Sequence, residues 1–102
     1  MRFEVGIGND TMLTALRLWG YSPERVDERT GEIGAVRPLA GMRYPRFHVY
    51  CKVSEKDRAA SVSLHLDHKQ PSYEGSSAHG GEYEGPLVEA EAERIKKMAS
   101  VA

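Results

Sequence analysis

The sequence predicts an α+β domain in which an antiparallel sheet of four or five strands packs one face on an N-terminal and a C-terminal helix. Two neighbouring segments, 47–53 and 60–67, alternate apolar with polar residues, which is the period of half-buried strands. The segments 11–19 and 86–102 instead repeat apolar residues at the spacing of an amphipathic helix. A length of 102 residues suffices for one modest core, so we expect a single domain over 1–102.

The first predicted element is a short strand over 3–7, where apolar residues alternate with polar residues and glycine. Asn9 and Asp10 then supply N-cap candidates for a helix over 11–19. Gly20 is a natural C-terminal stop for that helix, because glycine readily takes the left-handed conformation that ends helices.

A hairpin is predicted next, with arms over 25–28 and 32–37 and with Thr30-Gly31 at the turn. The alternative is a helix beginning at Pro23, since proline is favoured at the first helical position. We favour the hairpin, because Thr30-Gly31 separates two segments that read as strands and glycine suits the positive-φ position of a hairpin turn.

The strongest strand signals, 47–53 and 60–67, are joined by a short charged link that fits an antiparallel hairpin. Side chains alternate between the two faces of a strand, so the residue parity assigns each side chain to a face whatever the register. Four polar side chains are thereby predicted on the face opposite the core, namely His48, Tyr50, His65 and Asp67.

The register decides how close these side chains come. Pairing Cys51 with Val62 would place His48 directly across from His65, with their Cβ atoms about 5 Å apart. The same pairing would put Arg46 across from Asp67, whereas the neighbouring registers leave both pairs diagonal.

A long segment over 69–85, rich in glycine, serine and tyrosine, follows the last strong strand. Loops of this length without secondary structure are usually functional or disordered. We expect this loop to lie on the sheet face opposite the helices, where Tyr73 and Tyr83 can hold it against the sheet.

The final helix is predicted to begin at Pro86, which suits a first helical position. Its buried stripe is expected to consist of Val88, Ala92, Ile95 and Met98. The acidic residues near its start, Glu89, Glu91 and Glu93, complement the helix dipole, and Glu93 is placed to pair with Lys97. These charges are assigned to helix stability and to no chemistry.

Composition narrows the classes of function. Fourteen basic and fifteen acidic residues leave a net charge of −1, which argues against nucleic-acid binding. Cys51 is the only cysteine, so an intrachain disulfide and a four-thiolate zinc site are excluded. The sequence lacks an apolar run of the ~20 residues that a membrane span needs, and its first residues lack the apolar region of a signal peptide, so we expect neither. We expect a cytoplasmic protein without membrane association, whose sheet edge is open to pairing in a homodimer.

Metal binding is the sharpest functional hypothesis, because imidazole and carboxylate groups suit zinc or another divalent transition metal. The expected metal ligands are His65, Asp67, His79 and Glu82. Side chains expected to contact another bound ligand are His48, Tyr50, Tyr73 and Tyr83. His48 shares the face of His65 and Asp67 and is a further candidate metal ligand. Three protein ligands with one open position would permit hydrolysis, so a small metal-dependent hydrolase is one alternative.

Other interpretations of the same residues stay open. Asp67 could orient His65 for acid–base catalysis without a metal, with Ser63 or a tyrosine as the activated group. The polar sheet face could instead belong to a non-catalytic module that binds a protein or RNA. Finally, His48, His65 and Asp67 could simply hydrogen-bond to the returning loop.

A pattern of short motifs spans positions 65–85. It consists of His65-Leu66-Asp67, Lys69, Pro71-Ser72-Tyr73, Gly75, Ala78-His79, Gly81-Glu82-Tyr83 and Gly85. The pattern, HLDxKxPSYxG followed by AHxGEYxG, resembles the signature of a family of short, uncharacterised bacterial proteins. The resemblance marks these residues and implies no activity.

Overall fold

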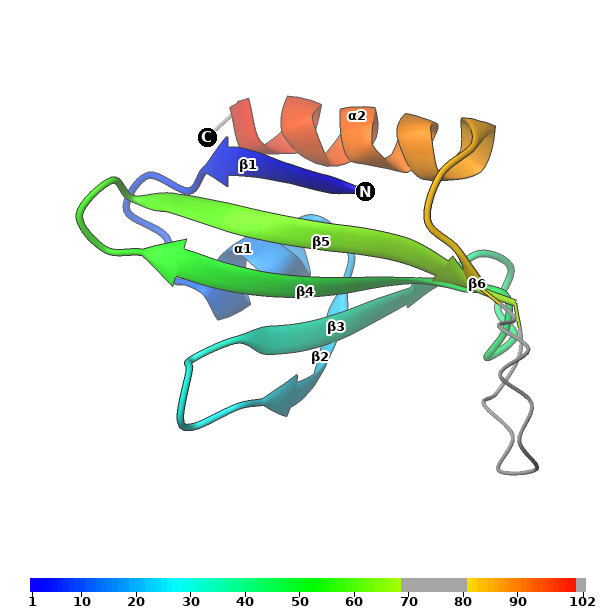
Figure 1. Ribbon diagram of the computed structural model, residues 1–102, viewed down its shortest axis with the longest axis horizontal. Helices are drawn as coiled ribbons and strands as arrows, with labels where there is room; N and C mark the ends of the chain where they lie inside the picture. Colours follow the sequence, from blue (N-terminus) through cyan, green and yellow to red (C-terminus); the bar gives the residue numbers. More distant parts are fainter. Residues whose placement is uncertain (69–80, 101–102) are drawn as a thin grey trace.

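The computed structural model describes residues 1–68 and 81–100, which form an antiparallel sheet and two helices (Figure 1). The elements in chain order are β1 (Arg2–Gly6), α1 (Met12–Leu18), β2 (Ser22–Val26), β3 (Ile33–Pro38), β4 (Arg46–Ser54), β5 (Ala59–Asp67), β6 (Gly81–Glu82) and α2 (Pro86–Ser100). The strand order is β1-β5-β4-β3-β2, and β6 also pairs with β5. The predicted α+β class with an antiparallel sheet is confirmed.

The strands β2 to β5 follow one another as a meander, and β1 joins the sheet beside β5 (Figure 1). The predicted hairpin over β2 and β3 is present, but its first arm spans Ser22–Val26 instead of 25–28. This arm contains Pro23, which an edge strand tolerates because one side of it needs no hydrogen-bond donor. A bulge lies between Pro23 and Arg25. Gly31 takes φ +80° in the turn, a conformation that favours glycine.

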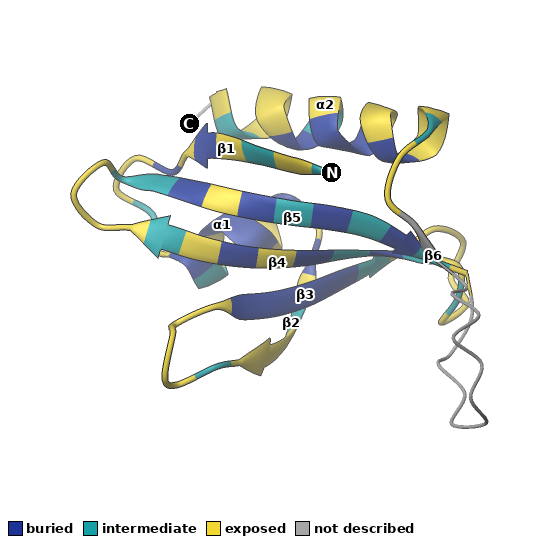
Figure 2. Ribbon diagram, in the orientation of Figure 1, coloured by how far each residue is buried: buried dark blue, intermediate teal, exposed yellow. Residues whose placement is uncertain are grey.

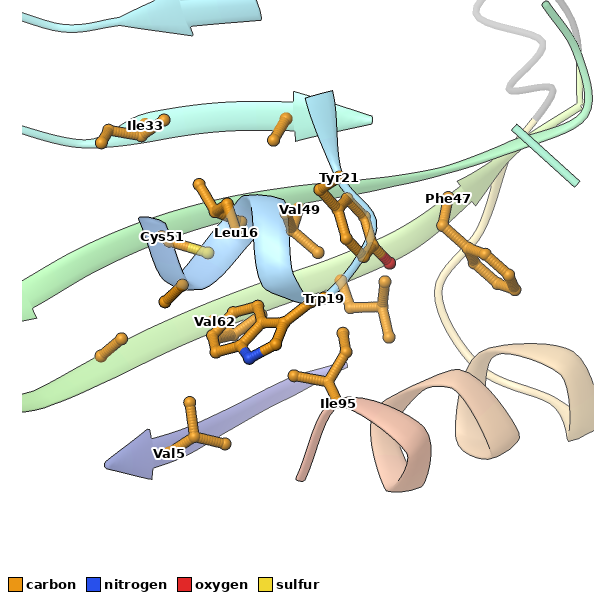
Figure 3. Packing of buried hydrophobic residues seen from close by; sticks show 14 of the residues in the cluster. Val5, Leu16, Trp19, Tyr21, Ile33, Phe47, Val49, Cys51, Val62 and Ile95 are labelled. Atoms are coloured by element: carbon orange, nitrogen blue, oxygen red, sulfur yellow. The ribbon is translucent and has the colours of Figure 1, made fainter. Parts of the chain in front are cut away.

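The core lies between the helices and one face of the sheet. Buried residues alternate with more exposed ones along β4 and β5 (Figure 2), as expected for strands with one covered face. Figure 3 shows Leu16 and Trp19, from α1 and its C-cap, beside Val49 and Val62 of the sheet, with Ile95 of α2 close by. The apolar positions of both strong strands therefore face the helices, and their polar positions face the other way.

The helix α1 is capped differently from the expectation. Thr11, and neither Asn9 nor Asp10, is the N-cap, and its hydroxyl accepts a hydrogen bond from the Thr14 backbone N–H at 3.1 Å. The helix therefore starts one residue later than predicted, because the cap must lie directly before the first helical residue. Gly20 follows the helix with φ +91°, the left-handed conformation that lets the chain leave a helix.

The buried stripe of α2 corrects two predictions. Val88, Ala92 and Ile95 are buried, but Met98 is 39% exposed, and Ala99 packs against the core at the end of the stripe. Glu91, which was assigned to the helix dipole and not to the buried stripe, is only 4% exposed.

The spacing of α2 explains both differences. Positions 88, 91, 92, 95 and 99 recur at intervals of three and four residues, so they form a single helical face. Glu93 belongs to the opposite, solvated face, where it pairs with Lys96 at 3.3 Å and not with Lys97 as predicted.

Candidate metal-binding site

The register brings the polar side chains of β4 and β5 together. Cys51 pairs with Val62, which places His48 directly across from His65. Arg46 lies across from Asp67 by the same register. Among the registers that residue parity allows, the structure therefore has the one that places His48 and His65 directly opposite each other.

Asp67 lies between the two imidazoles and contacts both. Its Oδ2 atom is 3.2 Å from His48 Nδ1, and its Oδ1 atom is 2.9 Å from His65 Nε2. An ionised carboxylate only accepts hydrogen bonds, so each ring donates from the nitrogen that faces Asp67. The side chains of His48, His65 and Asp67 are 14%, 12% and 21% exposed, which leaves them partly desolvated and still accessible to an ion.

Arg46 adds a positive charge beside this carboxylate. Its Nε atom is 3.5 Å from Asp67 Oδ2, while its Nη1 atom is 3.3 Å from Glu24 Oε2. The guanidinium also lies over the Tyr44 ring, 4.6 Å from the centroid. Arg46 Nε is buried and has no hydrogen-bond partner among the described residues. These contacts hold the guanidinium where it attracts the Asp67 carboxylate.

Four aromatic rings form a continuous row around the cluster, which we call the ring row: Tyr50, His48, His65 and Tyr83. The centroid distances are 4.5 Å for Tyr50 and His48, 5.0 Å for His48 and His65, and 5.1 Å for His65 and Tyr83. Because the imidazole faces contact neighbouring rings, they are covered by protein and offer no broad platform for a nucleobase.

The two ends of the ring row are held differently. Tyr50 lies opposite Gly34 of β3, and its ring would be in ordinary van der Waals contact with a Cβ atom at Gly34, at 3.5 Å. Tyr83 follows β6, and its backbone carbonyl accepts a hydrogen bond from the Met1 amino group at 3.0 Å. The pairing of β6 with β5 thus carries Tyr83 onto His65.

Burial shifts the protonation of two groups in the row. Burial is the main cause that lowers the pKa of His65, with His48 adding to the effect and Asp67 opposing it. His65 is consequently neutral at pH 7, which is the form that binds metal ions. Burial also raises the pKa of Tyr50, with the Asp67 and Glu32 carboxylates contributing, so its hydroxyl stays protonated.

The structure brings together five of the residues predicted for the site: His48, Tyr50, His65, Asp67 and Tyr83. Glu82 is in β6, where its backbone pairs with Leu66, and its side chain is not among those described. The predictions for Tyr73 and His79, and for most of the loop expected to cover the sheet face, concern positions outside the described residues.

Two neighbours of the cluster were not predicted. Gly34 lies beside the Tyr50 and His48 rings, and Val36 of β3 is paired with His48 and buried. The sequence of 32–37 does not predict either contact. Residues 33–36 of β3 are all buried, so no alternation of apolar and polar residues shows which of them face the cluster. Only the pairing of β3 with β4 reveals these contacts.

One ligand atom from each of His48, His65 and Asp67 can be chosen so that all three lie within 4.8 Å of one another. Two nitrogens and one carboxylate oxygen are a donor set that zinc, nickel, copper and iron accept. In the described residues neither helix combines the length and apolarity of a membrane span. No protein-family model, curated protein or solved structure matches this chain.

Proposed function

We propose that the protein binds one divalent transition-metal ion on the polar face of its sheet, with His48, His65 and Asp67 as ligands. The observation that supports this most directly is the convergence of the three donor groups within 4.8 Å. The partial burial of these side chains adds support, because a half-closed site excludes competing water and strengthens charge interactions.

The dimensions of the cluster suit a small ion. Donor atoms around a tetrahedral zinc ion lie about 3.3 Å apart, given zinc–nitrogen distances of about 2.0–2.1 Å. The two contacts of Asp67, at 2.9 and 3.2 Å, are already at this separation. Small rotations of the side chains would turn His48 Nδ1 and His65 Nε2 toward the ion. Each ring would then carry its proton on the nitrogen that does not bind the ion.

Three ligands from the protein leave a fourth coordination position. Catalytic zinc sites keep such a position for water or substrate, whereas structural sites fill it with a protein ligand. Either water or His79, the loop histidine predicted as a ligand, would complete the coordination of the ion proposed here. Arg46 would act from outside the ligand set by orienting Asp67, as residues behind metal ligands commonly do.

Calorimetric titration of protein purified without an affinity tag and stripped by chelation tests this function. We expect Zn²⁺ to bind at one equivalent per chain. His48→Ala, His65→Ala and Asp67→Asn should each weaken binding by at least about tenfold, since each removes a ligand. Cobalt substitution adds a visible spectrum that reports on the coordination.

Asp57→Asn is the matched control for Asp67→Asn, because Asp57 lies in the turn between β4 and β5, where it contacts Ser54, and is not in the converging group. It should bind Zn²⁺ like the unaltered chain. Circular dichroism must show that all variants remain folded. Absence of Zn²⁺, Co²⁺, Ni²⁺ and Cu²⁺ binding by the folded chain, or equal losses in the control and the ligand variants, would remove the proposal.

A further inference from the structure

A second feature of the polar sheet face adjoins the ring row. A groove of about 420 Å³ opens beside Tyr50, on β1, β4, β5 and the residue before β3. The register explains its origin: Ser63 lies between Tyr50 and Arg2, and Ser61 lies between Lys52 and Glu4. Two small side chains on β5 are thus flanked by long ones on both neighbouring strands, which leaves a trough along β5.

The groove is separate from the candidate metal ligands. His48 contacts one face of the Tyr50 ring at a centroid distance of 4.5 Å. Tyr50 lines the groove, whereas His48, His65 and Asp67 do not. Tyr50 therefore divides the two features, and the groove needs no metal ion to form.

The polar groups of the groove have hydrogen-bonding capacity to spare. Arg2, Glu4 and Glu32 are exposed, and among the described residues their side chains form no hydrogen bond or ion pair. Ser61 and Ser63 add two hydroxyls; that of Ser61 donates to the Lys52 backbone carbonyl at 3.4 Å and can still accept a hydrogen bond. Tyr50 adds an aromatic side chain that is 37% exposed. Binding sites for small polar molecules combine such a ring with a few convergent polar groups.

We propose that this groove binds a neutral polyhydroxylated ligand, a sugar unit. Two observations are the reason: the two carboxylates beside one guanidinium disfavour an anion, and the exposed Tyr50 ring favours a ligand with an apolar C–H face over a small ion or zwitterion. A hydroxyl both donates and accepts, so sugar hydroxyls can donate to Glu4 and Glu32 and accept from Arg2. The C–H face of the sugar ring packs on the Tyr50 ring and buries its apolar part.

Nuclear magnetic resonance of the ¹⁵N-labelled full chain, kept metal-free with a chelator, tests this inference. The probes are D-glucose, D-galactose, D-mannose and N-acetyl-D-glucosamine, with glycine as a zwitterionic comparison. At least one sugar should shift the amide signals of Tyr50, Ser61 and Ser63 saturably, and glycine should not. Tyr50→Ala should weaken that sugar about tenfold.

Ser63→Leu fills the groove from an outward position and should abolish the response to the sugar. Tyr44→Ala removes a tyrosine that packs under Arg46 and does not line the groove, so it is the control and should bind the sugar normally. Failure of all four sugars, a response located elsewhere, or a groove response to glycine alone would overturn the inference. Sugar binding without Zn²⁺ binding would remove only the metal function, and Zn²⁺ binding without sugar binding would remove only this inference.

Discussion

The buried carboxylate of Glu91 is expected to be among the most sensitive positions of the fold. Its oxygens accept hydrogen bonds from the Tyr21 hydroxyl at 2.6 Å and from Arg94 Nε and Nη2 at 2.7 and 2.8 Å. Arg37 Nη1 lies 3.4 Å away. Burial and the Glu91 carboxylate strongly raise the pKa of Tyr21, so the hydroxyl keeps its proton and donates to Glu91. The cluster joins α2 to the chain that follows α1.

Glu91→Ala removes the common acceptor of these donors. Breaking a buried ion pair costs about 3–5 kcal/mol, but Arg94 and Arg37 are 31% and 32% exposed, and water can solvate them again. The Tyr21 hydroxyl is buried and would lose its acceptor, at about 1–3 kcal/mol. We therefore expect the free energy of unfolding to fall by about 3 kcal/mol, or Tm by roughly 10–20 °C.

Urea denaturation followed by circular dichroism measures this change, with Tyr21→Phe and Glu93→Ala alongside. Tyr21→Phe should cost only about 1–2 kcal/mol, because both guanidinium groups still pair with Glu91. Glu93→Ala, on the exposed face of the same helix, should stay within about 0.5 kcal/mol. If Glu91→Ala were as mild as Glu93→Ala, the buried cluster would contribute nothing to the fold and the reasoning would be refuted.

Three further outcomes are expected. Burial lowers the pKa of His65 in the folded chain, so its imidazole binds a proton more readily in the unfolded chain. With chelator present, the contribution of neutral His65 to the free energy of unfolding is therefore complete above pH 6.5 and is lost as pH falls through the lowered folded pKa. Urea titrations from pH 8 to 5 should show this decline, and His65→Gln should reduce it. Burial raises the pKa of Cys51 to about 12, so native protein at pH 8 should react with a thiol reagent only through unfolding; labelling at the rate of a free thiol would contradict this. Zn²⁺ at about 100 times its Kd should add about 2.7 kcal/mol of stability, as seen by thermal melting, and His48→Ala should lose that gain at the same concentration.

The ring row links the two proposals chemically. Tyr50 contacts His48 and also borders the groove, so a ligand held in the groove would lie beside Tyr50, two residues along β4 from His48. If both sites are occupied together, the ion and the sugar would lie on either side of the contact between Tyr50 and His48. Zn²⁺ and sugar titrations carried out in both orders would then show mutual effects on affinity, because linkage between two sites is reciprocal.

Local sequence patterns determined much of this molecule. Alternation along 47–53 and 60–67 was enough to assign His48, Tyr50, His65 and Asp67 to one face, because strand side chains point to opposite sides in turn. The same reasoning identified the sheet, the β2–β3 hairpin and the last helix. It works where each residue's environment follows from its immediate neighbours in the chain.

Tertiary structure alone decided how those faces are used. The pairing of Cys51 with Val62 chose one register among several with equal parity, and only that choice places Asp67 between two imidazoles. Contact with Tyr21, 70 positions away in the chain, makes Glu91 a buried acceptor, whereas the sequence assigned it only to the helix dipole. Such contacts depend on which surfaces meet when distant segments pack. The residues next to a position in the sequence do not determine which distant segment will contact it.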